Sequence, residues 1–188
     1  RDLHSFPTRR SSDLVVKLKQ IAEVLQQSPY HVTAAHTYVD TTESNYYLEA
    51  KRPTDTLNFK QLYGPRELSL DLGHFRLKYP VTGFSQINES QIHNLIKSAG
   101  RLLGLEKGDH FLDLYCGYGL FSFALGEAAK SVLGVEWEGP SIDCAKASAR
   151  FLKKNYKFIA GKIDETFVQM RLPRPIPGEP ERILLDPP

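Results

Sequence analysis

The segment FLDLYCGYGLF, residues 111–121, places an acidic side chain, two closely spaced glycines and a cysteine in one turn. An apolar run ends around Asp113, Gly117 and Gly119 follow, and apolar residues at helical spacing begin at Leu120. A strand, a glycine turn and a helix open a nucleotide-binding βαβ unit, because glycine lets the backbone approach a ligand and the helix start offers free N–H groups. Two glycines alone are a weak signal, since an ordinary strand-to-helix turn has the same pattern.

A second acidic residue indicates which nucleotide the loop would hold. Glu136 ends the next apolar run, SVLGVEWE, and a carboxylate at that position can accept hydrogen bonds from both ribose hydroxyls. Ser122 stands where a dinucleotide site has its third glycine, which argues against a nicotinamide cofactor. Asp113, the glycine pair and Glu136 together form the pattern of an S-adenosylmethionine site, whose ligand has no pyrophosphate to demand that third glycine.

A third acidic residue, Asp186, follows the apolar run RILL and precedes two prolines. The prolines fix the chain and remove N–H donors, which would hold Asp186 at the carboxyl edge of a sheet, facing the methyl group of the cofactor. Asp-Pro alone more often marks a strand that ends in a turn. An acid followed by two prolines recurs in methyltransferases that act on nucleobases, so we interpret it functionally here.

The elements that must position these residues alternate between strand and helix from Asn88 onward. Asn88 and Gln91 form a variant of the capping box, which predicts the start of a helix that ends at Gly104. Further patterns predict strands at 110–114, 131–136, 156–160 and 182–186 and helices at 120–129, 140–153 and 163–169. This alternation predicts an α/β fold with a parallel sheet, and we assign residues 89–188 to a Rossmann-like methyltransferase domain that is incomplete at its C-terminal side.

The preceding segment has a different character. Residues 15–27 predict a helix, and aromatic and β-branched runs within 31–40, 45–50, 56–64 and 74–81 predict short, mostly antiparallel strands. We therefore predict a small β-rich α+β region over residues 15–88. Residues 1–14, RDLHSFPTRRSSDL, resemble the translation of a sequencing adapter, so we predict a non-native, disordered tail and a true N-terminus further upstream.

The composition excludes some classes of function. The chain has 188 residues, 41% hydrophobic and 24% charged, with a formal net charge of +2, so no strong basic field indicates nucleic acid, although a local patch can suffice. The two cysteines and six histidines show no metal-ligand spacing, so we predict no metal, and the cysteine usage fits a reduced, cytoplasmic compartment. No apolar run is long enough to cross a membrane.

Four segments in order resemble the RNA uracil-5-methyltransferases, which make 5-methyluridine in transfer RNA and 23S ribosomal RNA. The segments are FSQIN at 84–88, DLYCGYGLF at 113–121, GVE at 134–136 and LLDPP at 184–188. The resemblance runs from about residue 55 to the end, and the combination of F-x-Q-x-N with D-L-Y-C-G is specific. It implies a class I S-adenosylmethionine-dependent methyltransferase fold that acts on uracil C5 in tRNA or rRNA, with S-adenosyl-L-methionine as cofactor and RNA as partner.

The resemblance also implies site residues. Gln86 matches the F-x-Q glutamine at the cofactor and uracil site, Tyr115 an aromatic that touches the cofactor, and Asp186 the acid after the fourth strand. With Glu136 as the ribose-binding acid, the predicted cofactor-binding residues are Gln86, Asp113, Tyr115, Gly117, Gly119, Glu136 and Asp186. Leu120, where many relatives carry Asn or Thr, and Lys162, where an Asn or Asp approaches adenine, depart from the family pattern and bear on how tightly the cofactor binds.

The reaction itself requires a cysteine elsewhere. Uracil C5 is too weak a nucleophile to take a methyl group directly, so a thiolate adds to C6 first, and a base later removes the C5 proton. The target nucleotide is expected to leave its stack to reach the pocket. In the family, the cysteine of the glycine turn is not the nucleophile. We therefore expect Cys116 to be non-catalytic, Cys144 to pack in a helix, and the nucleophile and base to lie beyond Pro188.

Three other readings remain open from the sequence. One is a methyltransferase for an exocyclic amine of adenine, which needs no cysteine and would have an aromatic after Pro188. Another is a non-catalytic RNA- or nucleotide-binding remnant, which the two departures from the family pattern favour. The third is a nicotinamide oxidoreductase, which Ser122 and the Asp186-Pro-Pro segment disfavour.

Overall fold

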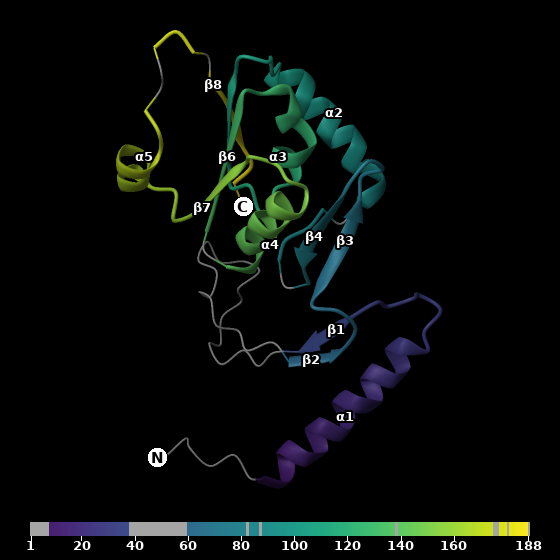
Figure 1. The fold of residues 1–188 in the computed structure, drawn as a ribbon. Helices are drawn as coiled ribbons and strands as arrows, with labels where there is room; N and C mark the ends of the chain where they lie inside the picture. The colour runs from purple at the N-terminus through teal and green to yellow at the C-terminus, as the bar shows by residue number, and fades with distance from the viewer. Residues whose placement is uncertain are drawn as a thin grey trace. The chain divides into compact units, whose positions relative to one another are not determined.

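The computed structural model describes residues 8–37, 60–81, 83–86, 88–137, 139–174, 177–179 and 181–187 (Figure 1). The chain divides into two compact units, Arg1–Arg66 and Glu67–Pro188. The domain boundary predicted at residue 88 therefore lies inside the second unit, and the segment from Glu67 groups with the parallel sheet rather than with the preceding region. The strand predicted at 45–50 lies outside the described residues.

The first unit contains helix α1 (Thr8–Gln26) and the antiparallel strands β1 (Ala35–Thr37) and β2 (Lys60–Tyr63). The helix begins at Thr8 rather than near residue 15, so residues 8–14 are helical and the prediction of disorder was wrong for them. Arginine and leucine in this stretch are good helix formers, which allows the helix to extend backwards. The origin of residues 1–14 as an adapter stays a prediction.

The second unit begins with an antiparallel hairpin of strands β3 (Glu67–Asp71) and β4 (Arg76–Pro80). Leu70 pairs with Leu77, and both side chains are buried. The turn is held by Asp71, which accepts a hydrogen bond from the Gly73 N–H at 2.8 Å and pairs with Arg76 at 2.9 Å. The sequence analysis predicted β4 but not β3, which has only two apolar residues between polar ones.

Four parallel strands form the sheet that carries the acidic residues: β5 (His110–Leu114), β6 (Ser131–Glu136), β7 (Lys157–Ala160) and β8 (Glu181–Leu185). Their spatial order is β7-β6-β5-β8, so the first strand in sequence is central and the fourth lies beside it. The predicted strands agree with these bounds to within a residue. In parallel strands the carboxyl ends meet at one edge, and ligands of open α/β sheets bind there.

Helices cover both faces of this sheet (Figure 1). Helices α2 (Ile92–Leu103), α3 (Leu120–Leu125) and α4 (Pro140–Phe151) lie on one side, and α5 (Glu165–Arg171) lies on the other. Phe111, Phe121 and Val132 form a core on the first side, while Leu114, Val135 and Phe167 form one on the second. The α/β class predicted from the alternating pattern is confirmed.

Two short 3₁₀ turns adjoin these helices, η1 (Glu89–Gln91) before α2 and η2 (Gly126–Ala128) after α3. The capping box predicted at Asn88 is wrong, because its side chain bonds no helix N–H and instead accepts from the Ser90 hydroxyl at 2.6 Å. The predicted stop at Gly104 is confirmed: its φ is 57°, a left-handed value that favours glycine, and its N–H donates to the Gly100 carbonyl.

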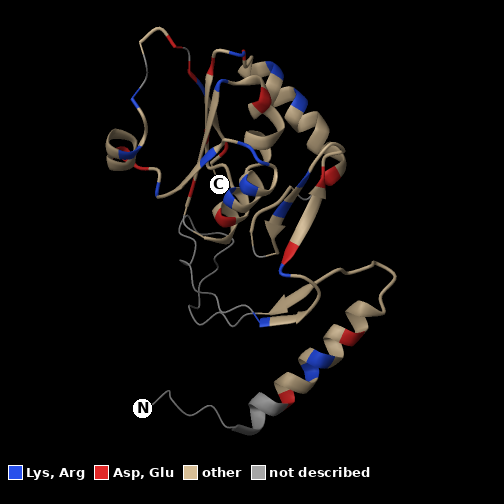
Figure 2. Ribbon diagram, viewed as in Figure 1, with Lys and Arg blue, Asp and Glu red and all other residues tan. Residues whose placement is uncertain are grey.

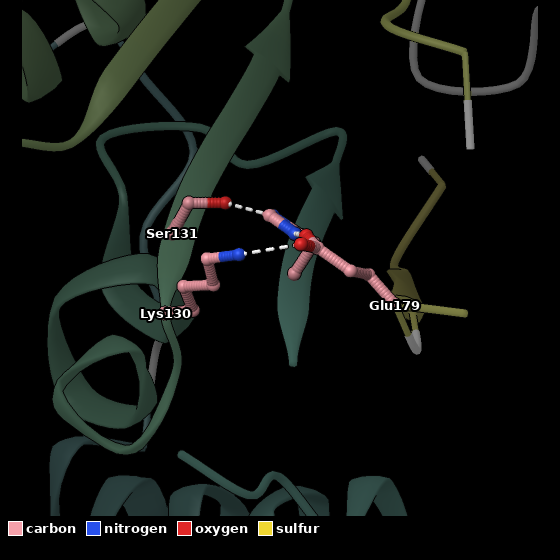
Figure 3. Close-up of polar contacts among 4 residues, drawn as sticks. Lys130, Ser131 and Glu179 are labelled. Atoms are coloured by element: carbon pink, nitrogen blue, oxygen red, sulfur yellow. Dashed lines mark hydrogen bonds and ion pairs between the residues drawn. The ribbon is translucent and has the colours of Figure 1, made fainter. Parts of the chain in front are cut away.

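At the opposite, amino edge of the sheet, four polar residues join β5, β6 and the segment before β8. His110 Nδ1 lies 2.6 Å from the Ser131 hydroxyl, and His110 Nε2 contacts the Glu179 carboxylate. Lys130 Nζ pairs with the same carboxylate at 2.7 Å, as Figure 3 shows. Lys130 and His110 lower the pKa of Glu179 through their hydrogen bonds. This cluster connects the segment before β8 to β5 and β6, at the end of the sheet opposite Glu136 and Asp186.

Replacing Glu179 with glutamine is expected to lower Tm at neutral pH, because Lys130 and His110 lose their anionic partner. A lowered pKa means that the carboxylate contributes stability above its unfolded pKa and loses it as pH falls through the folded value. Thermal melts followed by circular dichroism should therefore show a deficit that closes in acid. Glu181→Gln, at a carboxylate with no ion pair among the described residues, is the control. A deficit that persists unchanged in acid would contradict this account.

Candidate functional site

The loop between β5 and α3 has the backbone geometry that the glycines predicted. Tyr115, Gly117 and Gly119 have φ values of 64°, 56° and 89°, all in the left-handed region. A Cβ at Gly119 would lie 2.8 Å from the Phe123 ring, so a larger residue would also clash there. A Cβ at Gly117 would meet nothing within 4 Å, so this part of the backbone borders open space. The backbone of the loop is therefore accessible to a ligand at Gly117 and packs against the core at Gly119.

Glu136 at the tip of β6 is bound directly to this loop. Its Oε2 accepts a hydrogen bond from the Gly117 N–H at 2.8 Å, and its Oε1 accepts one from the Trp137 N–H at 2.7 Å. The side chain is half-buried. Two residues predicted for the same ligand, Gly117 and Glu136, are therefore in contact, and each carboxylate oxygen retains acceptor capacity beyond the one bond described.

Asp113 is fully buried at 0% exposure and held by a single neighbour. Its Oδ2 accepts hydrogen bonds from the Ser122 N–H at 2.9 Å and from the Ser122 hydroxyl at 2.6 Å. Its Oδ1 has no hydrogen-bond partner among the described residues. Burial raises the pKa of Asp113 to about 7, with smaller contributions from the charges of Asp186 and Glu136, while the bonds from Ser122 oppose the rise.

Ser122 is the site residue that the sequence analysis missed. It was noted only because it replaces a glycine, yet its backbone and side chain both donate to Asp113 across the turn. The available signal was a hydroxyl residue in the first turn of the helix after the loop, where a side chain can reach back to the preceding strand.

Asp186 and Tyr115 flank the same edge. The Asp186 N–H lies 3.5 Å from the Leu114 carbonyl, which continues the β5–β8 pairing, and its side chain is exposed. Tyr115 is half-buried against the Leu114, Val135 and Phe167 cluster. The structure therefore brings Asp113, Tyr115 and Asp186 to one end of the sheet, together with the bonded pair of Gly117 and Glu136.

Gln86 is less closely connected to the other predicted site residues than they are to one another. Its side chain is half-buried in the segment after β4, and no polar contact joins it to another predicted residue within the described part of the chain. The segment nevertheless lies beside the glycine loop. Ser85 is close enough to Tyr118 to counter the rise in the Tyr118 pKa caused by burial. A Cβ at Gly83 would lie 2.7 Å from the Ser141 hydroxyl at the start of α4.

Neither cysteine has the environment of a nucleophile. Burial, with the nearby carboxylates Asp113 and Glu136, raises the pKa of the Cys116 thiol well above its ordinary value. Burial and Glu67 raise the pKa of Cys144 to about 11. Because the thiolate is the reactive form, both groups are held in the unreactive state near neutral pH. Cys144 packs in a core cluster as expected, and the non-catalytic role of Cys116 stays a prediction.

Of the two departures from the family pattern, Leu120 has a local explanation. Leu120 is buried at 5% exposure in the cluster with Tyr118 and Phe123, so packing accounts for its apolar type. Lys162 is exposed. Asp164 caps α5 by accepting the Phe167 N–H at 2.9 Å. An open hollow of about 620 Å³ lies beside Lys162 and Asp164, and its lining is Lys162, Asp164, Thr166, Phe167, Met170 and Arg171.

The distribution of charged residues, possible metal sites and possible membrane-spanning helices indicates no second site among the described residues. Figure 2 shows basic and acidic residues interspersed along α1 and along α4 rather than gathered in one field. Among the described residues no group of three or more histidine, cysteine, aspartate or glutamate side chains could hold a metal ion. Within the same part of the chain, no helix is both long and apolar enough to cross a membrane.

Replacing Gly134 with alanine is expected to destabilise the second unit by about 1–3 kcal/mol, the usual cost of overpacking a core. A Cβ at this position in β6 would lie 2.5 Å from the Phe158 ring and 3.0 Å from Cys116 Sγ. Urea unfolding measures the change. Gly108→Ala is the matched control, since a Cβ there would meet nothing within 4 Å. Equal free energies of unfolding for the two variants would show that Phe158 and Cys116 can shift to accommodate a Cβ at Gly134.

Comparison with known proteins identifies the family. A sequence profile of the tRNA (Uracil-5-)-methyltransferase family matches residues 9–166. The chain is 31% identical over 131 residues to the 23S rRNA (uracil(1939)-C(5))-methyltransferase RlmD of Mannheimia succiniciproducens, covering 69% of this chain and 29% of the relative. It is 34% identical over 123 residues to RlmD of Marinomonas posidonica, covering 63% of this chain and 26% of the relative.

The chain thus spans less than a third of the length of these curated relatives. Among solved structures, Trm5b from Pyrococcus abyssi is similar in fold, with a TM-score of 0.53 and 21% identity over 79% of this chain and 42% of that one. The profile match covers most of the chain and includes the glycine loop, Glu136 and the segment with Gln86. The chain therefore belongs to the tRNA (uracil-5-)-methyltransferase family.

Proposed function

We propose that this chain is the cofactor-binding part of an enzyme that transfers a methyl group from S-adenosylmethionine to uracil C5 in RNA. The contact between the Gly117 N–H and the Glu136 carboxylate carries the proposal, because it joins the open glycine loop to an acid at the tip of the second strand. This arrangement suits a nucleoside whose ribose hydroxyls donate to Glu136 while the rest of the ligand lies along the loop.

The residues at this edge fit such a cofactor. Open space beside Gly117 leaves room for a ligand against the backbone, and Glu136 has acceptor capacity left for ribose hydroxyls. Tyr115 offers an aromatic surface, and the exposed Asp186 follows β8 at the same edge. We propose that these residues bind the cofactor together with Gln86, Asp113 and Gly119. When bound, the cofactor supplies an electrophilic methyl group on a sulfonium, and the chain holds and orients it.

The substrate part of the proposal rests on the family. The relatives named above are methyltransferases of 23S ribosomal RNA, whereas the family takes its name from transfer RNA. We propose RNA of one of these two kinds as the partner, and the cytoplasm as the place of action. The thiolate that adds to uracil C6 is not Cys116 or Cys144, whose environments hold them as thiols.

Calorimetric titration of the 188-residue chain with S-adenosylmethionine tests the cofactor assignment. One binding site is expected, with competition by S-adenosylhomocysteine and no binding of NAD. Binding of NAD in place of S-adenosylmethionine would favour the alternative that the chain is part of a nicotinamide oxidoreductase. Absence of binding by either nucleotide, from a chain that melts cooperatively, would favour a non-catalytic RNA-binding remnant.

A further inference from the structure

Three carboxylates gather at the carboxyl edge of the sheet, and only one of them is withdrawn from water. Asp186 is exposed and Glu136 is half-buried, but Asp113 is fully buried. One oxygen of Asp113 takes both of its hydrogen bonds from Ser122, and the other has no partner within the described residues. A buried carboxylate with half of its acceptors unused is unfavourable unless it carries a proton or faces a positive charge.

Among the residues that the structure describes, the charges that act on Asp113 include no positive partner. The groups that act on it from β8 and β6 are Asp186 and Glu136, both acidic, and the neighbouring Cys116 is held as a neutral thiol. Ser122, on α3, contributes dipoles but no charge. Burial and the two negative neighbours together raise the pKa of Asp113 to about 7, so the protonated form persists towards neutral pH.

The proposed cofactor would change this balance. S-adenosylmethionine carries a sulfonium and an ammonium against one carboxylate, a net charge of +1, and would lie along the loop that follows Asp113. A positive charge in a partly dehydrated site favours the ionised form of a nearby carboxyl group. We propose that Asp113 is protonated in much of the free protein and releases its proton to solvent when S-adenosylmethionine binds.

The step balances without any other reactant. The O–H bond of the Asp113 carboxyl group breaks, its electron pair stays on the carboxylate, and the proton passes to the buffer. This inference rests on the proposed function, because it needs the cofactor to bind at this edge. It adds a consequence that the family assignment does not contain: cofactor affinity should rise with pH through neutrality.

Calorimetry in two buffers measures the proton directly. Titration of the chain with S-adenosylmethionine in phosphate and in Tris at pH 7, buffers that differ in ionisation enthalpy, is expected to show release of a fraction of a proton per cofactor, because burial raises the pKa of Asp113 to about 7. Release should increase at pH 6 and approach zero at pH 9. S-adenosylhomocysteine, which lacks the sulfonium charge, should release less. Equal release with both ligands would overturn the proposal.

Variants locate the proton. Asp113→Asn should abolish release, whereas Asp143→Asn, at an exposed carboxylate on α4 with 74% of its side chain accessible, should leave it unchanged. Ser122→Ala removes a donor that favours the ionised form, so it should increase release at pH 7. Release that survives in Asp113→Asn would assign the proton to another group and overturn the proposal.

Carbon-13 NMR of the free chain, labelled at aspartate carboxyl groups, provides a measurement that needs no cofactor. The resonance that disappears in Asp113→Asn is expected to titrate near neutrality, and titration in the ordinary acidic range of aspartate would overturn the proposal. The two failures are distinguishable. Cofactor binding without proton release refutes only this inference, whereas absence of binding refutes the proposed function and this inference with it.

Discussion

Replacing Asp113 with asparagine is expected to stabilise the free protein at pH 8 and to flatten its stability profile between about pH 4 and pH 7. The pKa of Asp113 is raised from 3.8 to about 7, so across this interval the folded state binds more protons than the unfolded state. Stability therefore falls as pH rises, by up to roughly 4 kcal/mol at about 1.4 kcal/mol per pKa unit. Above pH 7 both states are ionised, and the full cost of burial remains.

Asparagine at this position would avoid the free-energy cost of burying an ionised carboxylate, and its own burial would cost less. Its amide oxygen can accept from Ser122 as Asp113 Oδ2 does, while its buried amide group loses hydrogen bonds to water, which costs about 1–3 kcal/mol. Urea unfolding at pH 5 and pH 8 gives the comparison, with Asp143→Asn as the control. We expect the Asp113→Asn variant to be less stable than the parent at pH 5 and more stable at pH 8. A variant that is less stable at both would mean that Asp113 is ionised at little cost.

Replacing Glu136 with alanine is expected to weaken binding of S-adenosylmethionine by at least a hundredfold. The side chain would lose two hydrogen bonds from ribose hydroxyls to a charged acceptor, each worth about 1.5–3 kcal/mol in favourable geometry. It would also lose the bond from the Gly117 N–H that fixes the loop. Isothermal titration measures the affinity, and Glu127→Ala, at an exposed carboxylate in η2, provides the control.

Glu136→Gln separates the two losses. Its amide oxygen can still accept from Gly117, but the group no longer offers charged acceptors on both sides, so an intermediate loss of about tenfold is expected. If the Glu136→Ala and Glu136→Gln variants bind the cofactor as tightly as the parent chain, Glu136 has only a structural role in the loop. Melting curves of both variants, without cofactor, report that structural role independently.

The parallel strands were predictable because their signals are local. Buried parallel strands have nearly continuous apolar runs such as FLDL and SVLGV, and the glycines at the loop mark where the chain must turn. Strand β3 was missed although Leu68, Leu70 and Leu72 alternate with polar residues, a pattern that favours a strand. Its pairing with β4 forms the hairpin.

The remaining features depend on proximity that sequence patterns indicate weakly or not at all. Ser122 is bonded to Asp113 only because the loop folds back on itself, and the pKa of Asp113 is raised by burial that the whole second unit creates. The amino-edge cluster draws its members from strands and a loop far apart in sequence. Gln86 was carried over from a resemblance, and its role at the cofactor stays a prediction.

The strand order also has a kinetic consequence. Asp113 lies between Gly134 of β6 and Leu184 of β8 in the register of the sheet, and β8 is the last of the four strands to leave the ribosome. Closing the long loop to β8 costs more chain entropy than pairing β5 with β6, so β8 is expected to dock late. Until it docks, we expect one side of Asp113 to remain open to water, so that the burial that raises its pKa is incomplete. The final docking step should therefore take up a proton near neutral pH, and folding should be slower in alkaline than in mildly acidic solution.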